Sequence, residues 1–291
     1  MSGPLGFTGA WLDRADQLRA DDAALAQAQA DPRARCLAMH GVDFIPAEGG
    51  GLLWEAIDPM DDRPLLLLGR DERGIGYFVR EAVPSRRVDA RSRTIMRFLP
   101  SLSDQDLAVY GGARSLVDWH ARHRFCASCG GETLVFRAGW GRKCGACDAE
   151  HFPRVDPVVI MLAEHQGKVL VARQPGFPPA FFSALAGFVE PGESIEEAVA
   201  RELFEEAGIR VRDIRYIASQ PWPFPSSLMM ACMAVTDDPT LTLDETELEA
   251  AMWVDKADVR AALSGDMNAP FVAPPLLAIA RHLLAHWVGL A

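Results

Sequence analysis

Apolar residues in the second half of the chain follow the periods of strands and helices. Two apolar runs, DPVVIMLA and VLVAR, flank the turn EHQGK and predict a β-hairpin. Ile195, Val199 and Leu203 lie four residues apart and predict a helix with one buried stripe. Further strands are expected at RYIASQPW and SLMMACMAV, and further helices near KADVRAALSG and at the C-terminus. This order predicts an α+β or α/β sandwich domain over residues 154–291.

The first 122 residues predict a separate mixed α/β domain. A helix-prone stretch at 14–36 precedes three short strand-like runs, GLLWEAI, RPLLLLGR and GIGYFVREAV, which are separated by Gly, Pro and Asp turns. Residues 103–123 have helical spacing, and Ser103 is placed to cap the start of that helix. The fold class predicted for the whole chain is α+β.

Composition limits the classes of function. The 291 residues suggest about two domains, and 49% hydrophobic with 24% charged residues is typical of globular protein. A net charge of -11 disfavours non-specific binding to nucleic acid or anionic membranes. We see no signal peptide and no apolar run of ~20 residues, so we expect a cytoplasmic protein without a membrane partner.

Four of the six cysteines form two Cys-x-x-Cys pairs, Cys126 with Cys129 and Cys144 with Cys147. Two such knuckles complete a tetrahedral Zn²⁺ site, and four thiolates leave no open position for chemistry. Two disulfides or free thiols are the alternative, which a cytoplasmic location disfavours. The pattern predicts a structural zinc ribbon over residues 123–153, with His151 as a bystander.

A glutamate-rich helix is expected after Ser194, because Ser194 and Glu197 form a capping box, and it should end before Gly208. At 100° per residue, three glutamates share a sector of about 100° on this helix: Glu202, Glu205 and Glu206. Clustered carboxylates suit Mg²⁺ or Mn²⁺. A solvated acidic face is the alternative from composition alone.

The stretch GFVEPGESIEEAVARELFEEAGI, residues 187–209, matches the Nudix box G-x5-E-x7-R-E-U-x-E-E-x-G-U, where U is apolar. The resemblance implies an α/β/α sandwich that hydrolyses a nucleoside diphosphate linked to another moiety with the help of divalent cations. It assigns Glu202 and Glu206 as metal ligands and Glu205 as ligand or base. The carbonyl of Ala186 is a further ligand of this type, and Arg201 should pair with Glu193.

A distal acidic residue often completes such a metal site. In the stretch DETELEAAMW, Glu247 occupies the matching place, and Glu245 and Glu249 are rivals.

A second motif, SQPWPFPSSLM at 219–229, alternates proline with Trp222 and Phe224. Prolines stiffen an extended backbone, and rigid aromatic faces offer stacking platforms for flat bases. The alternative is a proline-rich loop whose two rings pack in the core. The motif resembles the array that marks the NADH pyrophosphatase subfamily, which also has a four-cysteine ribbon before its Nudix domain and an N-terminal domain of its own.

This resemblance implies cleavage of NAD(H) to AMP and nicotinamide mononucleotide. It also implies a homodimer, and some members of the subfamily remove NAD caps from RNA 5′ ends. The substrate loop carried over is Gln220, Pro221, Trp222, Pro223, Phe224, Pro225, Ser226 and Ser227, with Arg97, Phe152 and Ala280 as further contacts. The chain departs from some relatives in having Gly139 before Trp140, where they place an acidic substrate contact.

Two other functions fit parts of the sequence. An ADP-sugar or dinucleoside polyphosphate hydrolase would use the same Nudix box. A non-catalytic nucleotide sensor or RNA-binding module would keep the fold without turnover, but the intact Glu202, Glu205 and Glu206 argue against it.

Overall fold

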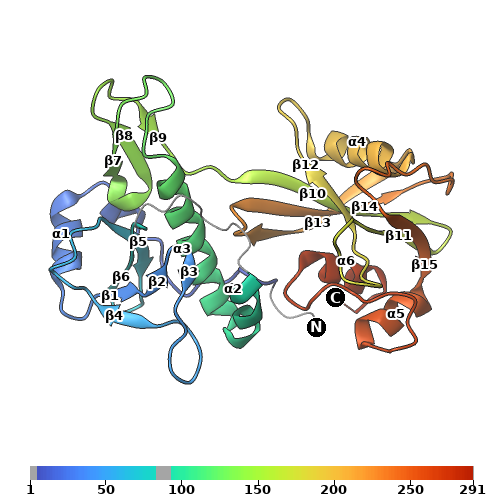
Figure 1. Ribbon diagram of the computed structural model, residues 1–291, viewed down its shortest axis with the longest axis horizontal. Helices are drawn as coiled ribbons and strands as arrows, with labels where there is room; N and C mark the ends of the chain where they lie inside the picture. Colours follow the sequence, from blue (N-terminus) through green and yellow to red (C-terminus); the bar gives the residue numbers. More distant parts are fainter. Residues whose placement is uncertain (1–4, 83–92, 291) are drawn as a thin grey trace. The chain divides into compact units, whose positions relative to one another are not determined.

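The computed structural model describes residues 5–82 and 93–290, and the chain divides into two compact units (Figure 1). The C-terminal unit contains Asp156–Pro221, the chain from Ser227 onward and the N-terminal segment up to Gly6. The N-terminal unit contains Phe7–Val155 and also Trp222–Ser226. The boundaries predicted after residues 122 and 153 stay predictions. No helix in the described ranges is long and apolar enough to cross a bilayer.

The elements of the N-terminal unit include the three strands expected from its apolar runs and the long capped helix. They are η1 (Asp16–Arg19), α1 (Asp22–Ala30), β1 (Arg35–Leu37), β2 (Met39–His40), β3 (Asp43–Phe44), β4 (Trp54–Ala56), β5 (Leu65–Arg70), β6 (Gly76–Arg80), α2 (Arg93–Phe98), η2 (Leu99–Ser101), α3 (Asp104–Arg122), β7 (Thr133–Phe136), η3 (Arg137–Gly139), β8 (Gly141–Cys144) and β9 (Glu150–His151). Val83, the last residue of the third predicted strand, lies outside the described residues.

The N-terminal sheet has the strand order β4-β1-β6-β5, in which β1 and β6 are parallel. Helix α3 packs on β5 and β6. Its start is capped as predicted, because the Ser103 side chain accepts a hydrogen bond from the Asp106 amide at 3.1 Å. Leu67 and Phe78 of the sheet are fully buried together with Ala28 of α1. This unit therefore has its own hydrophobic core.

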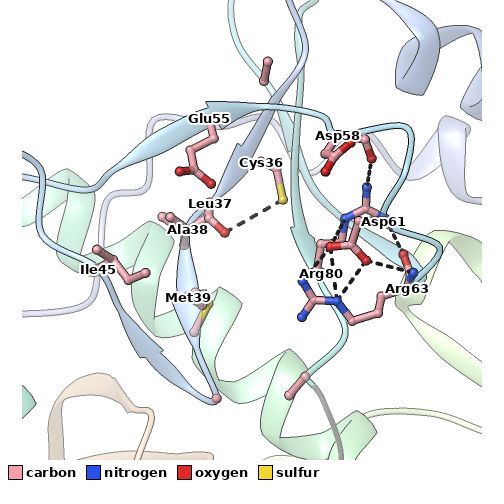
Figure 2. Close-up of a pocket in the computed structure, with 13 residues that line it drawn as sticks. Cys36, Leu37, Ala38, Met39, Ile45, Glu55, Asp58, Asp61, Arg63 and Arg80 are labelled. Atoms are coloured by element: carbon pink, nitrogen blue, oxygen red, sulfur yellow. Dashed lines mark hydrogen bonds and ion pairs between the residues drawn. The ribbon is translucent and has the colours of Figure 1, made fainter.

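A polar cavity of about 140 Å³ lies along β1 and β4 of this unit (Figure 2). Cys36 and Glu55 line it, as do Arg63, Asp61 and Arg80. Arg63 donates to the Asp61 carboxylate at 2.6 Å, and Arg80 donates to two main-chain carbonyls and pairs with Asp61. Both guanidinium groups thus have partners within the protein.

The C-terminal unit contains the predicted hairpin, the glutamate-rich helix and two elements that the sequence pattern missed, β12 and β15. Its elements are β10 (Asp156–His165), β11 (Lys168–Arg173), β12 (Leu185–Phe188), α4 (Ile195–Ala207), β13 (Arg212–Trp222), β14 (Ser227–Val235), β15 (Ala250–Asp255), α5 (Lys256–Ser264) and α6 (Ile279–Trp287). The sheet order is β13-β14-β10-β11-β15, and β12 pairs with β10.

Alternate residues of β10 pack on opposite faces of this sheet. Val159 and Met161 join the core beneath α4, whereas Ile160 and Leu162 join the core formed with α5 and α6. Successive side chains of a strand point to opposite faces of the sheet. The six central residues of β10 are all apolar, so the strand is buried on both faces. Figure 1 shows α4 on one face and α5 and α6 on the other, which confirms the predicted α/β/α sandwich.

The glutamate-rich helix α4 has the predicted ends. Ser194 accepts from the Glu197 amide while Glu197 accepts from the Ser194 amide, which completes the capping box. Gly208 ends the helix in the left-handed region with φ 73°. Leu203 and Val199 are fully buried against the sheet. The helix is therefore held in one orientation, which decides where its glutamates point.

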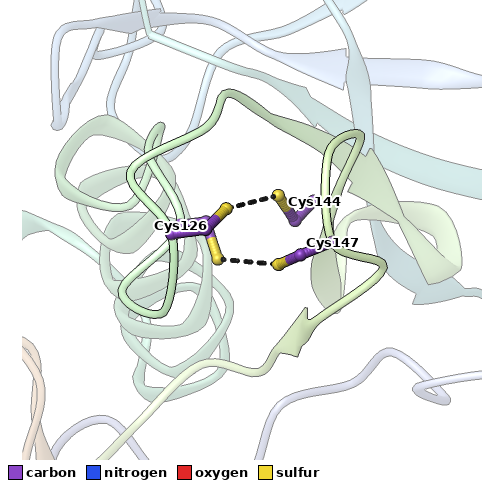
Figure 3. Close-up of side chains that lie close together, drawn as sticks. Cys126, Cys144 and Cys147 are labelled. Atoms are coloured by element: carbon purple, nitrogen blue, oxygen red, sulfur yellow. Dashed lines mark hydrogen bonds between the residues drawn. The ribbon is translucent and has the colours of Figure 1, made fainter.

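The four paired cysteines meet at one point in the ribbon formed by β7, β8 and β9 (Figure 3). Their sulfur atoms all lie within 4.8 Å of one another, and the Cys126–Cys147 and Cys129–Cys144 separations are 3.7 and 3.5 Å. Sulfurs bound tetrahedrally at 2.3 Å from zinc are about 3.8 Å apart, whereas a disulfide is about 2.05 Å long. The quartet thus fits zinc, and the disulfide alternative does not hold.

We expect one zinc ion per chain in protein purified without chelator. Because four thiolates close the coordination sphere, chelating the zinc should lower the melting temperature of the N-terminal unit. Elemental analysis together with thermal unfolding before and after chelation measures both effects. Zinc-free protein with an unchanged melting temperature would contradict a structural zinc.

Candidate active site on the glutamate helix

The site begins where β12 passes directly over α4. A Cβ atom placed on Gly187 would lie 1.9 Å from the carboxylate carbon of Glu202. Only glycine allows this approach, and it brings the main chain beside Ala186 to the carboxylates of α4. The first glycine of the motif is therefore explained by steric exclusion at the site.

Arg201 organises the acidic groups around this contact. Its guanidinium donates to both carboxylate oxygens of Glu193, at 2.6 and 2.9 Å, which confirms the predicted ion pair. It also donates to Glu202 and Glu205, each at 2.9 Å, and to the Phe188 carbonyl at 2.8 Å. Its hydrogen bonds lower the pKa of Glu193 to about 2. One arginine thus ties the motif's loop, β12 and α4 together.

The three glutamates of α4 differ in burial. Glu202 is 9% and Glu206 only 3% exposed, whereas the side chain of Glu205 is 58% exposed. Burial, followed by the negative charges of Glu202 and Glu247, raises the pKa of Glu206 to about 8. Burial also raises the pKa of Glu202. A solvated acidic face would not produce these shifts, because water would stabilise the charges.

Glu206 and Ala186 line one cavity of about 130 Å³. The other lining residues come from β10, β11, β12 and the loops beside them: Ile160, Ala172, Gln174, Phe177, Ser183, Ala184, Leu185 and Leu248. The buried Oε2 atom of Glu206 has no hydrogen-bond partner in the protein. A buried, unpaired carboxylate oxygen is costly, so it calls for a cation.

The residues present fit a divalent cation. Glu202 and Glu206 offer carboxylate oxygens, and Ala186 lies on the strand above them. Hard oxygen ligands of this kind are those of Mg²⁺ and Mn²⁺. Among residues 5–82 and 93–290, only the cysteine quartet has three or more ligand atoms within 4.8 Å. Arg201 donates to Glu202 and Glu205, whereas the Oε2 atom of Glu206 has no hydrogen-bond partner in the protein.

The three distal glutamates differ in their surroundings. Glu249 forms an ion pair with Arg173 at 3.2 Å, so its charge is already compensated within the protein. Glu247 is the distal glutamate that raises the pKa values of both Glu202 and Glu206. These observations favour Glu247 over Glu249 and Glu245 as the ligand from this stretch.

Asp244 is a neighbour of Glu206 that sequence reasoning missed. Its charge contributes to the raised pKa of Glu206, and its amide donates to the Glu206 carbonyl at 3.0 Å. The acidic stretch DETELE includes it, but its four carboxylates look alike in sequence. Only the fold shows which of them face α4.

Gln220, the first residue of the predicted substrate loop, is fully buried. Its side-chain amide donates to the carbonyls of Gly6 and Leu277 at 2.9 and 2.8 Å, and its oxygen accepts from the Ile279 amide at 2.9 Å. One N–H donor therefore binds the N-terminal segment at Gly6, and the other donor and the oxygen bind the start of α6, so the side chain has a structural role.

The two aromatic rings of the loop are not equivalent. Phe224 is 4% exposed, with the rings of Phe7 and Trp222 at 6.0 and 5.2 Å and the guanidinium carbon of Arg114 4.8 Å from its centre. Trp222 is only half-buried. Core packing accounts for Phe224, whereas Trp222 retains an open part that could stack on a base.

The other expected contacts lie in different settings. Arg97 is exposed on α2, Phe152 is exposed just after β9, and Ala280 is 4% exposed in α6. Because the Ala280 side chain is part of the core, only its main chain could contact a ligand. Ser226 donates to the Arg154 carbonyl at 3.3 Å, and Ser227 is buried at the start of β14.

Comparisons with known proteins agree with these motifs. Residues 153–273 match the family described as NUDIX domain, and residues 121–152 match the NADH pyrophosphatase zinc ribbon domain. The human NAD-capped RNA hydrolase NUDT12 is 41% identical over 66% of this chain, which spans only 44% of that relative's length.

The NAD-capped RNA hydrolases NudC of Mycobacterium bovis and Mycobacterium tuberculosis are similar over almost the whole chain. Each is 38% identical over 95% of this chain and 92% of its own length. The chain therefore belongs to the Nudix family, in the group that carries the NADH pyrophosphatase zinc ribbon.

Proposed function

We propose that this protein hydrolyses the pyrophosphate bond of NAD(H) to AMP and nicotinamide mononucleotide, and that it removes NAD caps from RNA. The observation that carries the proposal is the buried, unpaired Glu206 oxygen beside Glu202. It lies in a chain similar over 95% of its length to a protein named NAD-capped RNA hydrolase. Nothing in the glutamate helix itself selects NAD(H), so the substrate rests on that similarity and on the loop motif.

The proposed metal ligands are Glu202, Glu206, Glu247 and the Ala186 carbonyl. A bound Mg²⁺ or Mn²⁺ would neutralise phosphate charge and lower the pKa of a water. Glu205 is the most exposed of the α4 trio, and its Oε2 atom accepts from Arg201, which leaves Oε1 to accept the proton of the attacking water. Arg201 keeps Glu202 and Glu205 in place while Glu193 holds Arg201.

The proposal includes a homodimer and a cytoplasmic location. The dimer follows from the subfamily resemblance. A reducing compartment suits four cysteines that bind zinc rather than form disulfides.

The test is product analysis with NADH, NAD-capped RNA, ADP-ribose and diadenosine tetraphosphate in Mg²⁺ or Mn²⁺. We expect AMP and nicotinamide mononucleotide from NADH. Glu206→Gln keeps the side-chain volume but removes a charged ligand, so turnover should fall by about a thousandfold or more while the melting temperature is kept. Wild-type turnover confined to ADP-ribose or diadenosine tetraphosphate would favour the other hydrolase classes.

Gly187→Ala should also abolish turnover without unfolding the protein. The new methyl group displaces the Glu202 carboxylate, which would lie 1.9 Å away, and so breaks its bond to Arg201. The exposed Gly192 provides a matched control in the same motif, because a Cβ atom added there would meet no other atom within 4 Å, although its φ is 100°. Gly192→Ala should cost stability through strain while retaining much more activity. Equal activity losses in the two variants would contradict the role given to Gly187.

Trp222→Ala and Phe224→Ala should have different effects. Loss of a stacked base costs roughly 1–3 kcal/mol, so Trp222→Ala should lower kcat/KM for NADH about ten- to a hundredfold and leave ADP-ribose hydrolysis less affected. Phe224→Ala removes a buried ring and should mainly lower the melting temperature, as a loss of about 3–5 kcal/mol implies. Comparing both substrates with thermal unfolding separates the effects, and identical losses from Trp222→Ala on both substrates would rule out stacking.

A further inference from the structure

The aromatic loop is built into the N-terminal unit although it connects two strands of the Nudix domain. Residues Trp222–Ser226 join β13 to β14 along the chain, yet they pack with Phe7–Val155. The conformation of the loop is therefore set by residues of the N-terminal unit.

Arg114 of α3 makes the principal contacts to the loop. Its side chain is almost fully buried, its Nε atom donates to the Pro223 carbonyl at 2.9 Å, and its guanidinium carbon lies 4.8 Å from the centre of the Phe224 ring. Its NH1 atom pairs with Asp43 at 2.6 Å. The planar guanidinium group thus binds the main chain and the ring of the loop together while one carboxylate compensates its charge.

Two further contacts come from the same face of the unit. The Ser115 hydroxyl donates to the Pro225 carbonyl at 3.3 Å. Phe7 places its ring edge-on to Trp222, with the ring centres 5.8 Å apart, and it fits there because Gly111 has no side chain. Proline has no N–H group, so a loop that contains Pro223 and Pro225 depends largely on its carbonyls for hydrogen bonds. Helix α3 binds two of those carbonyls.

We propose that Arg114 is a positioning residue that fixes the orientation of the Trp222 ring for the substrate. The inference rests on the proposed function, because it assumes that the loop contacts NAD(H). It gives the N-terminal unit a role in substrate selectivity, whereas the pyrophosphate chemistry stays with α4. Because Trp222 would contact the base and not the reacting phosphates, loss of the anchor should raise KM for NADH and leave kcat nearly unchanged.

The experiment compares Arg114→Met and Arg114→Lys with Arg142→Met. Arg142 is a matched control because it is 5% exposed in the same unit but binds Thr133, Glu81 and His120. Hydrogen exchange of peptides over 222–229, KM and kcat for NADH and ADP-ribose, and the melting temperature are measured for each variant in the full chain.

We expect Arg114→Met to speed amide exchange in the loop and to raise KM for NADH about tenfold or more, with kcat and ADP-ribose hydrolysis changed by less than about threefold. Arg114→Lys keeps the charge but loses the rigid fork, so its effect should be intermediate. Arg142→Met should lower the melting temperature without the selective rise in KM. Equal losses on both substrates that follow the melting temperature in all variants would overturn the proposal.

A variant that removes only one hydrogen bond also tests whether α3 anchors the loop. If Arg114→Met does not fold, Ser115→Ala takes its place, since that change removes only the bond to Pro225. Faster loop exchange in Ser115→Ala supports the anchor, and unchanged exchange overturns it. If the wild type does not hydrolyse NADH at all, the proposed function fails, yet the exchange data still decide whether α3 anchors the loop.

Discussion

Charge compensation on one helix is the constraint on which the active-site half of the structure depends. Helix α4 carries two buried glutamates, and like charges at this spacing repel one another. Arg201 offsets part of this repulsion through Glu193, Glu202 and Glu205. Glu206 is left without a hydrogen-bond partner for one oxygen. One arginine therefore compensates part of the negative charge of α4, and under the proposed function a divalent cation at Glu206 would compensate more of it.

Backbone geometry and electrostatics both hold β12 close to the carboxylates of α4. The approach of Gly187 to Glu202 brings β12 over the carboxylates, and Arg201 binds the Phe188 carbonyl of that strand. The strand therefore cannot move away from α4 without breaking a charged hydrogen bond. Both features keep the main chain at Ala186 and Gly187 close to the carboxylates of α4, which is the arrangement that the proposed metal ligands require.

In the proposed reaction, each unit contributes a different set of residues. The C-terminal unit holds the carboxylates, and their chemistry would serve any pyrophosphate. The N-terminal unit contains the closed cysteine site and the packing of the aromatic loop. Under the proposed function, selectivity would come from the loop that packs in the N-terminal unit, since the rigid support of a contact decides its precision.

The sequence by itself determined the local structure and the zinc ligand set. The capping box at Ser194 and the glycine at 208 set the ends of α4, and the spacing of the cysteines predicted the zinc quartet, because these signals act within a few residues of the chain. The tertiary structure alone decided that Glu247 rather than Glu249 acts on Glu206, and that Phe224 is buried beneath Arg114. Such contacts join residues up to about a hundred positions apart, where no local pattern distinguishes one carboxylate or one ring from its neighbour.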